Sequence, residues 1–338
     1  MHQFINSLSV NDNVEAIYLV KTASSKLNKN NSPYLDMTLC DKTGEINAKV
    51  WNFSGEAPKD SSYVGVKGTV TDFNRVLQLK LDKFMPIDKS QVNESDYVKT
   101  APEKPETMLA VLYKTTAGFK NAYLRDIVNL MLKKYEDRLL YYPAAQRMHH
   151  AELAGLLHHI TSMLAVGDAL VAHYTFLNRE LLLSGIILHD LGKIDELISS
   201  ELGIVSEYSL RGNLLGHLVD GANTLGLAND RLRERELKSR GLSSAEEIQA
   251  FFKEFDDKNG EYLLLLQHML ISHHGTLEFG SAKLPMFPEA VMLNLIDNMD
   301  ARMYMLENQM ENLSPGSISL EKVFGLDTKI YHPNYSEE

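Results

Sequence analysis

Apolar and polar positions alternate along the first quarter of the chain. Five short segments follow this period-two pattern: 14–20, 34–39, 46–51, 64–70 and 76–81. Such alternation predicts strands with one buried face. Five short strands joined by polar turns predict a small closed β-barrel. The barrel could bind a ligand, or it could be a spacer or an oligomerisation unit.

Beyond residue 106 the apolar positions recur every three or four residues, which predicts helices throughout. The polar stretch before them contains Pro102 and Pro105 and is typical of a linker. We therefore expect a multidomain chain, with an N-terminal OB-fold barrel at 1–88, a linker at 89–107 and an all-α domain at 108–325. A tail at 326–338 would follow. The charged, amphipathic segment 229–258 predicts a solvated helix pair.

Composition narrows the class of protein. The 338 residues are 44% hydrophobic, which is ordinary for a chain with a buried core. Cys40 is the only cysteine, so an internal disulfide is excluded and a reducing cytoplasm is expected. Residues 1–10 show no basic region followed by an apolar core, so no signal peptide is expected. No apolar run approaches the roughly 18 residues of a membrane span. The net charge of −11 argues against indiscriminate binding along duplex DNA.

Histidines and aspartates carry the chemistry. His189 and Asp190 end the apolar run 181–188, just before Gly192, a residue suited to a left-handed helix cap. Further candidates recur along the helical region: His159, His217, the pair His273-His274, and Asp297 with Asp300 on one helix face. A lone histidine is more often structural than a ligand. Together these nitrogen and oxygen donors, without a nearby thiolate, suit one or two divalent metals in a hydrolase better than structural zinc.

The order of these residues resembles a known pattern. His159, His189-Asp190 and Asp297 resemble the H…HD…D motif of the HD superfamily of metal-dependent phosphohydrolases. Over about residues 10–330 the chain resembles more closely the YhaM-type 3′-to-5′ exoribonucleases, which join an OB-fold to an HD domain. The matching stretches are 149–151, 155–157, 188–193, 215–217, 272–275, 278–281 and 297–301. His159 aligns with the first metal ligand, and His158 stands where the family has an acidic residue.

The resemblance implies roles for these residues. His159, His189, Asp190 and Asp297 would hold one metal, and Asp190 would bridge to a second metal completed by His217 with His273, His274 or both. Manganese suits such sites best, with iron, magnesium or cobalt as alternatives. The two metals would activate a water that attacks the terminal phosphodiester of single-stranded RNA or DNA, releasing a nucleoside 5′-monophosphate. Lys193 would neutralise phosphate charge, or it simply favours the dipole at a helix end.

The remaining candidates surround these ligands. His149 and His150 could contact phosphate, or have a capping or supporting role instead. His158 and Asp300 are expected behind the ligands, with Asp300 orienting a histidine. His268 is expected in the core or in the same supporting layer.

In the barrel, stacked aromatics and a basic groove would hold the single strand. The candidates are Tyr34, Trp51, Phe53, Phe73, Lys42, Lys49 and Arg75. Trp51 could equally belong to the barrel core.

Two other functions are compatible with the sequence. An HD-type phosphodiesterase acting on a small or cyclic nucleotide is one, although Thr276 and Leu277 follow Gly275 where such enzymes carry a Gly-Tyr-Pro extension. A nucleic-acid-binding protein with a structural metal is the other. Assembly into a homo-oligomer fits the large surfaces of a two-domain chain, and no membrane partner is expected.

Overall fold

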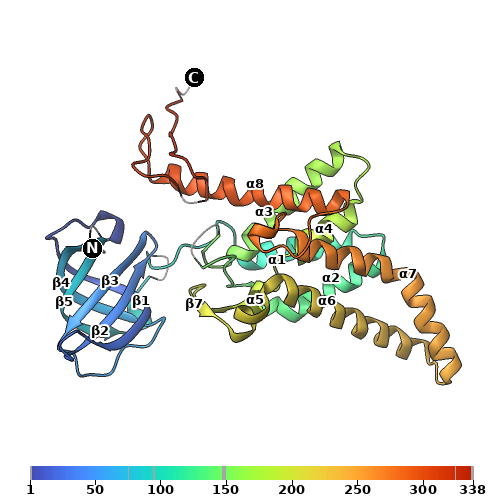
Figure 1. Ribbon diagram of the computed structural model, residues 1–338, viewed down its shortest axis with the longest axis horizontal. Coiled ribbons are helices and arrows are strands. Elements are labelled where there is room, and N and C mark those ends of the chain that lie inside the picture. The colour runs from blue at the N-terminus through green and yellow to red at the C-terminus, as the bar shows by residue number, and fades with distance from the viewer. Residues whose placement is uncertain (1, 75, 94–95, 147–149, 324, 336–338) are drawn as a thin grey trace. The chain divides into compact units, whose positions relative to one another are not determined.

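The computed structural model describes residues 2–74, 76–93, 96–146, 150–323 and 325–335. Arg75 and His149, both singled out from the sequence, lie outside these described residues. The chain divides into two compact units (Figure 1). One comprises residues 1–101 with the short segments 151–153 and 198–207, and the other comprises the rest. The second unit begins at residue 102, inside the stretch 89–107 that the sequence predicts as a linker.

The first unit is the expected five-stranded closed barrel. Its strands are β1 (Asn13–Leu27), β2 (Pro33–Asp41), β3 (Gly44–Trp51), β4 (Tyr63–Phe73) and β5 (Val76–Ile87). They pair in the order β1-β2-β3-β5-β4, and β4 returns to β1. Among the described strand pairs of the barrel, β3–β5 is parallel and the others are antiparallel. The five-stranded Greek-key barrel of this kind is the OB-fold.

The period-two pattern explains the barrel interior. Leu35, Met37 and Leu39 of β2 are buried at alternate positions, and Val64 and Val70 of β4 meet them inside. Two short 3-10 helices, η1 (Ile5–Ser7) and η2 (Lys89–Gln91), flank the strands. A second apolar cluster forms outside the barrel wall. Its buried members are Leu19, Cys40, Tyr63, Tyr97, Val98 and Leu202.

The second unit is built from helices. These are α1 (Pro105–Ala117), α2 (Ala122–Leu139), α3 (Gly155–His173), α4 (Arg179–Leu188), α5 (Lys193–Glu196), α6 (Leu210–Arg240), α7 (Ala245–Ser272) and α8 (Pro288–Glu311). A 3-10 turn, η4 (Leu277–Phe279), follows α7. A two-stranded hairpin of β6 (Leu197–Ser199) and β7 (Val205–Tyr208) follows α5 in the sequence, and its residues 198–207 belong to the first unit.

Helix α4 is the centre of the helical unit. It contacts α2, α3, α7 and α8, and every residue from Leu181 to Leu188 is buried. A helix that is apolar all round must be surrounded by protein, which explains the continuous apolar run in the sequence. Asn178 caps its N-terminus by accepting from the backbone N–H of Leu181. Because the residues up to Leu188 are buried, the C-terminal end of α4 lies deep inside the unit.

The charged segment 229–258 forms the helix pair that its pattern predicts. It comprises the end of α6 and the start of α7, which run side by side in Figure 1. Arg240 pairs with Glu236 and Glu254 on its outer surface, and Phe251 and Phe255 are buried. A capping box at Ser244 and Glu247 starts α7.

Helix α3 qualifies the expectation about membrane spans. By length and mean hydropathy it is the one described helix that is long and apolar enough to cross a membrane. However, Leu156, Leu157, Ile160 and Met163 are fully buried among the other helices. Composition of this kind is also typical of a core helix, and α3 has that position here.

Candidate metal centre

Five helices bring the seven predicted ligands together in the helical unit. His159 lies on α3 and Asp297 on α8, while His189 and Asp190 follow the buried end of α4. His217 lies in α6, immediately after Gly216, whose φ of 67° interrupts the helix. His273 and His274 follow the last residue of α7. Because each donor lies on a helix or at its end, packing of the core fixes its position.

One half of the cluster surrounds Oδ2 of Asp190. The Nε2 atom of His189 is 3.4 Å from it and that of His159 is 3.8 Å away. His159 Nε2 is also 3.3 Å from His189 Nε2 and 3.3 Å from Asp297 Oδ1. These four residues are the set that the HD motif predicts for one metal.

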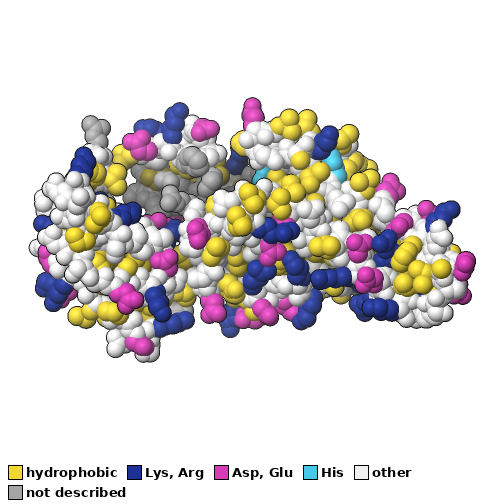
Figure 2. Space-filling model, turned by 60° about the horizontal axis from the view of Figure 1, so that its bottom comes forward, with side chains coloured by type: hydrophobic (Ala, Val, Ile, Leu, Met, Phe, Trp, Pro, Cys, Tyr) yellow, Lys and Arg dark blue, Asp and Glu magenta, His cyan; other side chains and the backbone are white. Residues whose placement is uncertain are grey.

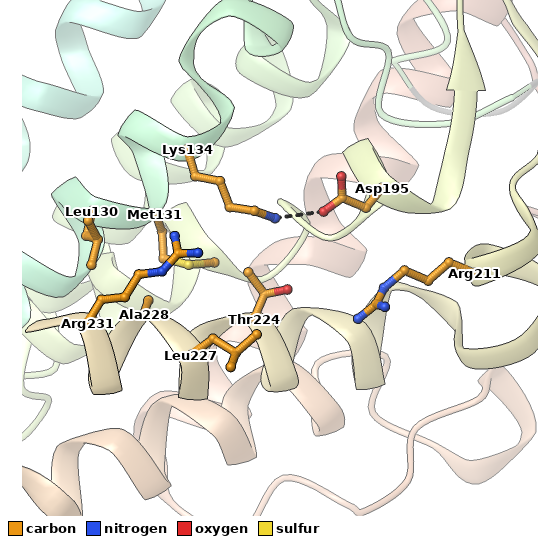
Figure 3. A pocket seen from close by; sticks show the side chains of 9 residues that line it. All are labelled: Leu130, Met131, Lys134, Asp195, Arg211, Thr224, Leu227, Ala228 and Arg231. Carbon is orange, nitrogen blue, oxygen red and sulfur yellow. Dashed lines mark hydrogen bonds and ion pairs between the residues drawn. The ribbon is translucent and has the colours of Figure 1, made fainter.

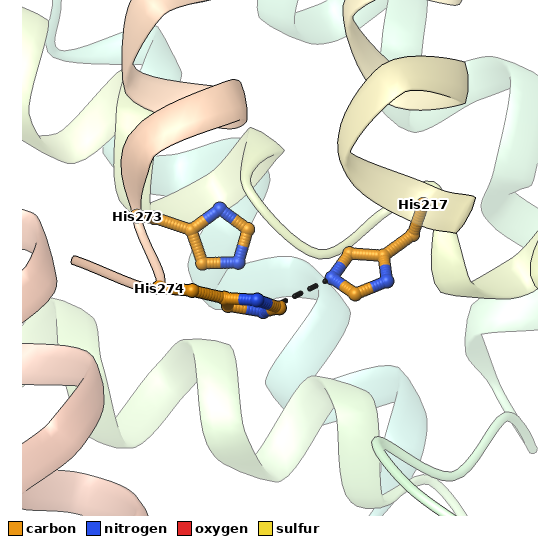
Figure 4. A group of neighbouring side chains, drawn as sticks. All are labelled: His217, His273 and His274. Atoms are coloured by element: carbon orange, nitrogen blue, oxygen red, sulfur yellow. Dashed lines mark hydrogen bonds between the residues drawn. The ribbon is translucent and has the colours of Figure 1, made fainter. Parts of the chain in front are cut away.

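The other half faces Oδ1 of the same carboxylate. His217 Nε2 and His273 Nε2 are each 3.5 Å from Asp190 Oδ1. His274 completes this half, with its Nε2 atom 3.3 Å from that of His217 (Figure 4). The two oxygens of Asp190 therefore face two separate groups of imidazoles, as a carboxylate bridging two cations would.

The second ring nitrogen of each histidine is already engaged. The Nδ1 atoms of His189, His273 and His274 donate to the backbone carbonyls of Ile186, Leu270 and Phe279, each over 2.8 Å. A carbonyl oxygen can only accept, so the proton lies on Nδ1 and the lone pair of Nε2 points into the cluster. This is the tautomer that binds metal through Nε2.

Two buried atoms in the cluster are left without a hydrogen bond. Among the described residues, Asp190 Oδ1 and His273 Nε2 are fully buried acceptors with no donor within reach. Burying such groups unpaired costs about 1–3 kcal/mol each. A divalent cation between them would satisfy both, so the donor set fits a metal site.

The charges in the cluster also favour the binding of a cation. Burial lowers the pKa of His159, but hydrogen bonds to Asp297 and Asp300 outweigh it and raise that pKa to about 9. Burial raises the pKa of Asp190, yet the nearby charge of Lys193 and contacts with His189 hold it well below its usual range. The carboxylates are thus ionised, and they make the site a strong attractor for a positive ion.

Lys193 contacts the bridging carboxylate directly. It is the first residue of α5, and its Nζ donates to Asp190 Oδ2 over 2.7 Å. Burial lowers the pKa of Lys193, but the charge of Asp190 more than compensates, so the ammonium group stays protonated. The structure thus places this lysine beside the ligands rather than at an exposed helix end.

Asp300 and His150 lie behind His159. Asp300 Oδ2 accepts from His159 Nδ1 over 2.7 Å and from His150 Nε2 over 2.8 Å, while Ser162 donates to its other oxygen. His150 is buried and packs against the ring of Tyr304, with 4.0 Å between centroids. The geometry therefore favours the supporting role of His150 over phosphate contact. His158 contacts His150 in the same layer, with 3.2 Å between their Nδ1 atoms.

His268 stands apart from the cluster. Its Nε2 atom accepts from the backbone N–H of Met286 over 3.1 Å, and its ring packs against Phe287. It is half-buried and anchors the segment after η4, so it belongs neither to the core nor to the layer behind the ligands.

Glu196 and Asn294 support the cluster, and the sequence did not single them out. Glu196 Oε2 accepts from His217 Nδ1 over 2.9 Å, and its other oxygen accepts from the backbone N–H of His217. Asn294 donates to the backbone carbonyl of His273 over 2.7 Å. Each contact joins residues about twenty positions apart, so no local pattern reveals it.

The expectation of a left-handed cap at Gly192 is wrong. Its φ of −61° is ordinary right-handed helix. Glycine is required there for space, because a Cβ atom would lie 2.6 Å from the carbonyl oxygen of His217. Gly192 therefore allows α5 to approach the start of the second half of α6.

The barrel carries the expected aromatic side chains. Tyr34 and Trp51 pack together with 5.0 Å between ring centroids, and Lys49 Nζ lies 5.7–5.9 Å from the rings of Tyr34, Trp51 and Phe73. We call these four residues the aromatic patch. Trp51 is 44% exposed and Phe73 62% exposed, so neither is a core residue.

Two other barrel candidates have different positions. Phe53 packs partly against the barrel core and contacts Phe84. Lys42 pairs with Asp96 and lies over the ring of Phe4. The structure does not bring either of them into the aromatic patch.

The sequence is similar to that of known proteins along nearly its whole length. No family model matches the chain. The proteins named 3′-5′ exoribonuclease YhaM from Shouchella clausii (strain KSM-K16) and Geobacillus sp. (strain WCH70) are each 35% identical to it, over 334 and 332 residues. The alignments cover 97% of this chain and 96% and 94% of those proteins.

Among solved structures, the second OB-fold domain of replication protein A from Methanococcus maripaludis matches 26% of this chain, with 23% identity and a TM-score of 0.22. That likeness is too low to carry an argument. The two curated relatives, by contrast, match the barrel and the helical unit together. The chain therefore belongs to the YhaM family of 3′-5′ exoribonucleases.

Proposed function

We propose that this chain is a metal-dependent 3′-to-5′ exoribonuclease that degrades single-stranded RNA to nucleoside 5′-monophosphates. The observation that carries the proposal is the Asp190 carboxylate, whose two oxygens face two groups of imidazoles in a chain that matches YhaM proteins along nearly its full length. The relatives do not favour the alternative of a phosphodiesterase for small or cyclic nucleotides. Single-stranded DNA is a second candidate substrate.

The proposed ligands are those predicted from the sequence. His159, His189 and Asp297 would hold one cation, and His217, His273 and His274 the other, with Asp190 between them. When bound, such a pair of cations polarises phosphoryl oxygens and lowers the pKa of a bound water toward neutrality. A donor set of imidazoles and carboxylates suits manganese, with iron, magnesium or cobalt as alternatives.

The chain's own groups would prepare this site for the reaction. Carbonyls of Ile186, Leu270 and Phe279 keep three imidazoles in the metal-binding tautomer, and Glu196 does the same for His217. Lys193 uses one N–H on Asp190, and its remaining N–H groups would stabilise charge that develops on the phosphate. The aromatic patch would stack unpaired bases, with Lys49 beside the backbone.

Two RNAs of one sequence test the proposal, one labelled at the 5′ end and one at the 3′ end. With manganese present, the 5′-labelled RNA should shorten stepwise, while the 3′ label should appear at once as a mononucleotide. Asp190→Asn should lose at least about 100-fold in rate while remaining folded by circular dichroism. Full activity in Asp190→Asn, or faster turnover of a cyclic dinucleotide than of RNA, would contradict the proposal.

A further inference from the structure

A second charged feature lies in the helical unit, in a pocket of about 190 Å³ between α2 and α6 (Figure 3). Its walls combine apolar side chains with three cations and one carboxylate. The lining residues are Leu130, Met131, Lys134, Asp195, Arg211, Thr224, Leu227, Ala228 and Arg231. None of them belongs to the metal centre, so the cluster described above does not explain the pocket.

Positive charge dominates this pocket although the chain as a whole is acidic. Lys134 donates to Asp195 Oδ2 over 2.8 Å, and Arg138 donates to the other oxygen over 2.7 Å. Arg211 donates to the buried carboxylate of Asp220 over 2.5 Å. Arg138 and Asp220 pair with lining residues but do not line the pocket themselves. The walls thus carry three cations and one carboxylate, a local sign opposite to the net charge of −11. Figure 2 shows Lys and Arg side chains gathered on this face of the helical unit.

Arg231 is the lining cation whose guanidinium N–H groups are available to a ligand. Within the described part of the chain, no carboxylate pairs with it and no hydrogen bond of its guanidinium group is found. Its neighbours on α6 differ: Arg233 pairs with Asp230 and Asp256, and Arg240 with Glu236 and Glu254. An exposed arginine aimed into a pocket without a partner has five N–H donors available for an anion.

The shape of the pocket indicates a ligand with several charges. Arg211 and Arg231 enter it from opposite ends, and Lys134 extends between them (Figure 3). The helix from His217 to Arg231 alone advances about 20 Å at about 1.5 Å per residue. A single phosphate cannot contact both arginines fully across such a span, whereas a strand with regularly spaced phosphates can.

The pocket is also connected to the metal centre through α5. Asp195, which receives Lys134, Tyr135 and Arg138, is followed by Glu196, which orients His217. Lys193, at the start of the same short helix, contacts Asp190. A strand that binds in the pocket therefore lies against the element that supports the metal ligands.

We propose that the α2–α6 pocket binds the phosphate backbone of the single-stranded RNA substrate, with Arg211, Lys134 and Arg231 contacting successive phosphates. The inference rests on the proposed function for the identity of the strand. It adds a sequence-independent contact area, since phosphate contacts fix the position of a strand without reading bases. Such contacts would hold the RNA between rounds of hydrolysis.

Salt dependence of RNA binding tests the pocket without measuring turnover. The metal-loaded full-length protein is titrated with a fluorescent phosphorothioate RNA at several salt concentrations, and a gel confirms that the RNA stays intact. The logarithm of the binding constant falls linearly with the logarithm of the salt concentration. For a single strand, each lost phosphate contact makes this negative slope shallower by about 0.7. Arg231→Gln should therefore reduce the slope by about 0.7, and Leu227→Glu, which places a negative charge at an exposed position in the pocket, should also reduce it.

Arg235→Gln is the matched control, because Arg235 is exposed on the same helix and does not line the pocket. It should leave the slope unchanged. Wild-type slopes in both Arg231→Gln and Leu227→Glu would overturn the inference, and the proposed exonuclease activity would still stand. Adenosine monophosphate binding that depends on Arg231, with an unchanged RNA slope, would also overturn it by showing a mononucleotide pocket instead.

Discussion

Glu196 holds His217 at two points: its Oε2 atom accepts from His217 Nδ1 over 2.9 Å, and its Oε1 atom from the backbone N–H over 3.1 Å. Burial raises the pKa of Glu196, but these bonds and the charge of His217 lower it below its usual range. The carboxylate is therefore ionised, and it fixes both the ring orientation and the tautomer of a candidate ligand.

Glu196→Gln should weaken metal binding without removing a ligand. Losing a supporting contact of this kind costs about 10–100-fold in metal affinity. Titration of the metal-free protein with Mn²⁺ by calorimetry should show weaker binding with unchanged stoichiometry. Glu234→Gln, at an exposed position on α6, is the control. Equal affinities for Glu196→Gln and wild type would show that the His217–Glu196 contact does not support metal binding.

Asp297 and Asp300 should behave differently although both contact His159. Asp297 is a proposed ligand on the Nε2 side of the ring, while Asp300 accepts from Nδ1. Asp297→Asn should lower the number of bound metals, measured by elemental analysis after gel filtration. Asp300→Asn should keep the number but lower the affinity by about 10–100-fold. The reverse assignment would follow if Asp300→Asn lost a metal and Asp297→Asn did not.

Gly192→Ala should be destabilising because its Cβ atom would meet the carbonyl oxygen of His217 at 2.6 Å. Overpacking of this kind costs about 1–3 kcal/mol in the free energy of unfolding. Gly260→Ala in α7 is the control, since a Cβ atom there meets nothing within 4 Å, and it should stabilise by about 0.4–1 kcal/mol. Urea unfolding of both variants measures the difference. If Gly192→Ala left the free energy of unfolding unchanged, α5 would be able to move away from α6 at no cost.

Trp51→Ala and Phe73→Ala should weaken RNA binding without unfolding the barrel, because both rings are exposed. Stacking of one base on an aromatic side chain contributes about 1–3 kcal/mol. Fluorescence anisotropy with a labelled single strand measures the loss. Phe176→Ala, at a ring that is also exposed but lies in the helical unit, should bind RNA as wild type does. If both barrel variants bound the single strand with wild-type affinity, the aromatic patch would not contact the RNA.

Stability in acid should depend on Asp195. Burial raises the pKa of its carboxyl, but hydrogen bonds from Lys134, Tyr135 and Arg138 lower it overall. A lowered folded-state pKa means that the stabilisation is complete above the unfolded value of about 3.9 and is lost as pH falls through the folded value. Asp195→Asn should therefore reduce the slope of unfolding free energy against pH below about pH 4. Asp137→Asn, at an exposed position on α2, should change that slope less.

The fold and the cluster of candidate metal ligands could be predicted because each has a local signal. Alternation in 34–39 fixes the inner face of β2, and the apolar run before His189 identifies a fully buried helix with the ligands at its end. The supporting contacts have no such signal. Glu196 and His217 meet only because α5 packs against α6, and the space limit at Gly192 comes from the same contact. The sequence leaves both a phosphate contact and a supporting role open for His150, because its burial against Tyr304 depends on the packing of α8.

Counting the metals on Asp190 tests the central claim most directly. The metal-free protein is titrated with Mn²⁺, and free Mn²⁺ is followed by electron paramagnetic resonance. Wild type should bind two equivalents per chain, and Asp190→Asn should lose tight binding of at least one of them, since its amide cannot serve both groups of imidazoles as a charged bridge. Two tightly bound equivalents in Asp190→Asn, or fewer than one in wild type, would contradict a pair of cations bridged by this carboxylate.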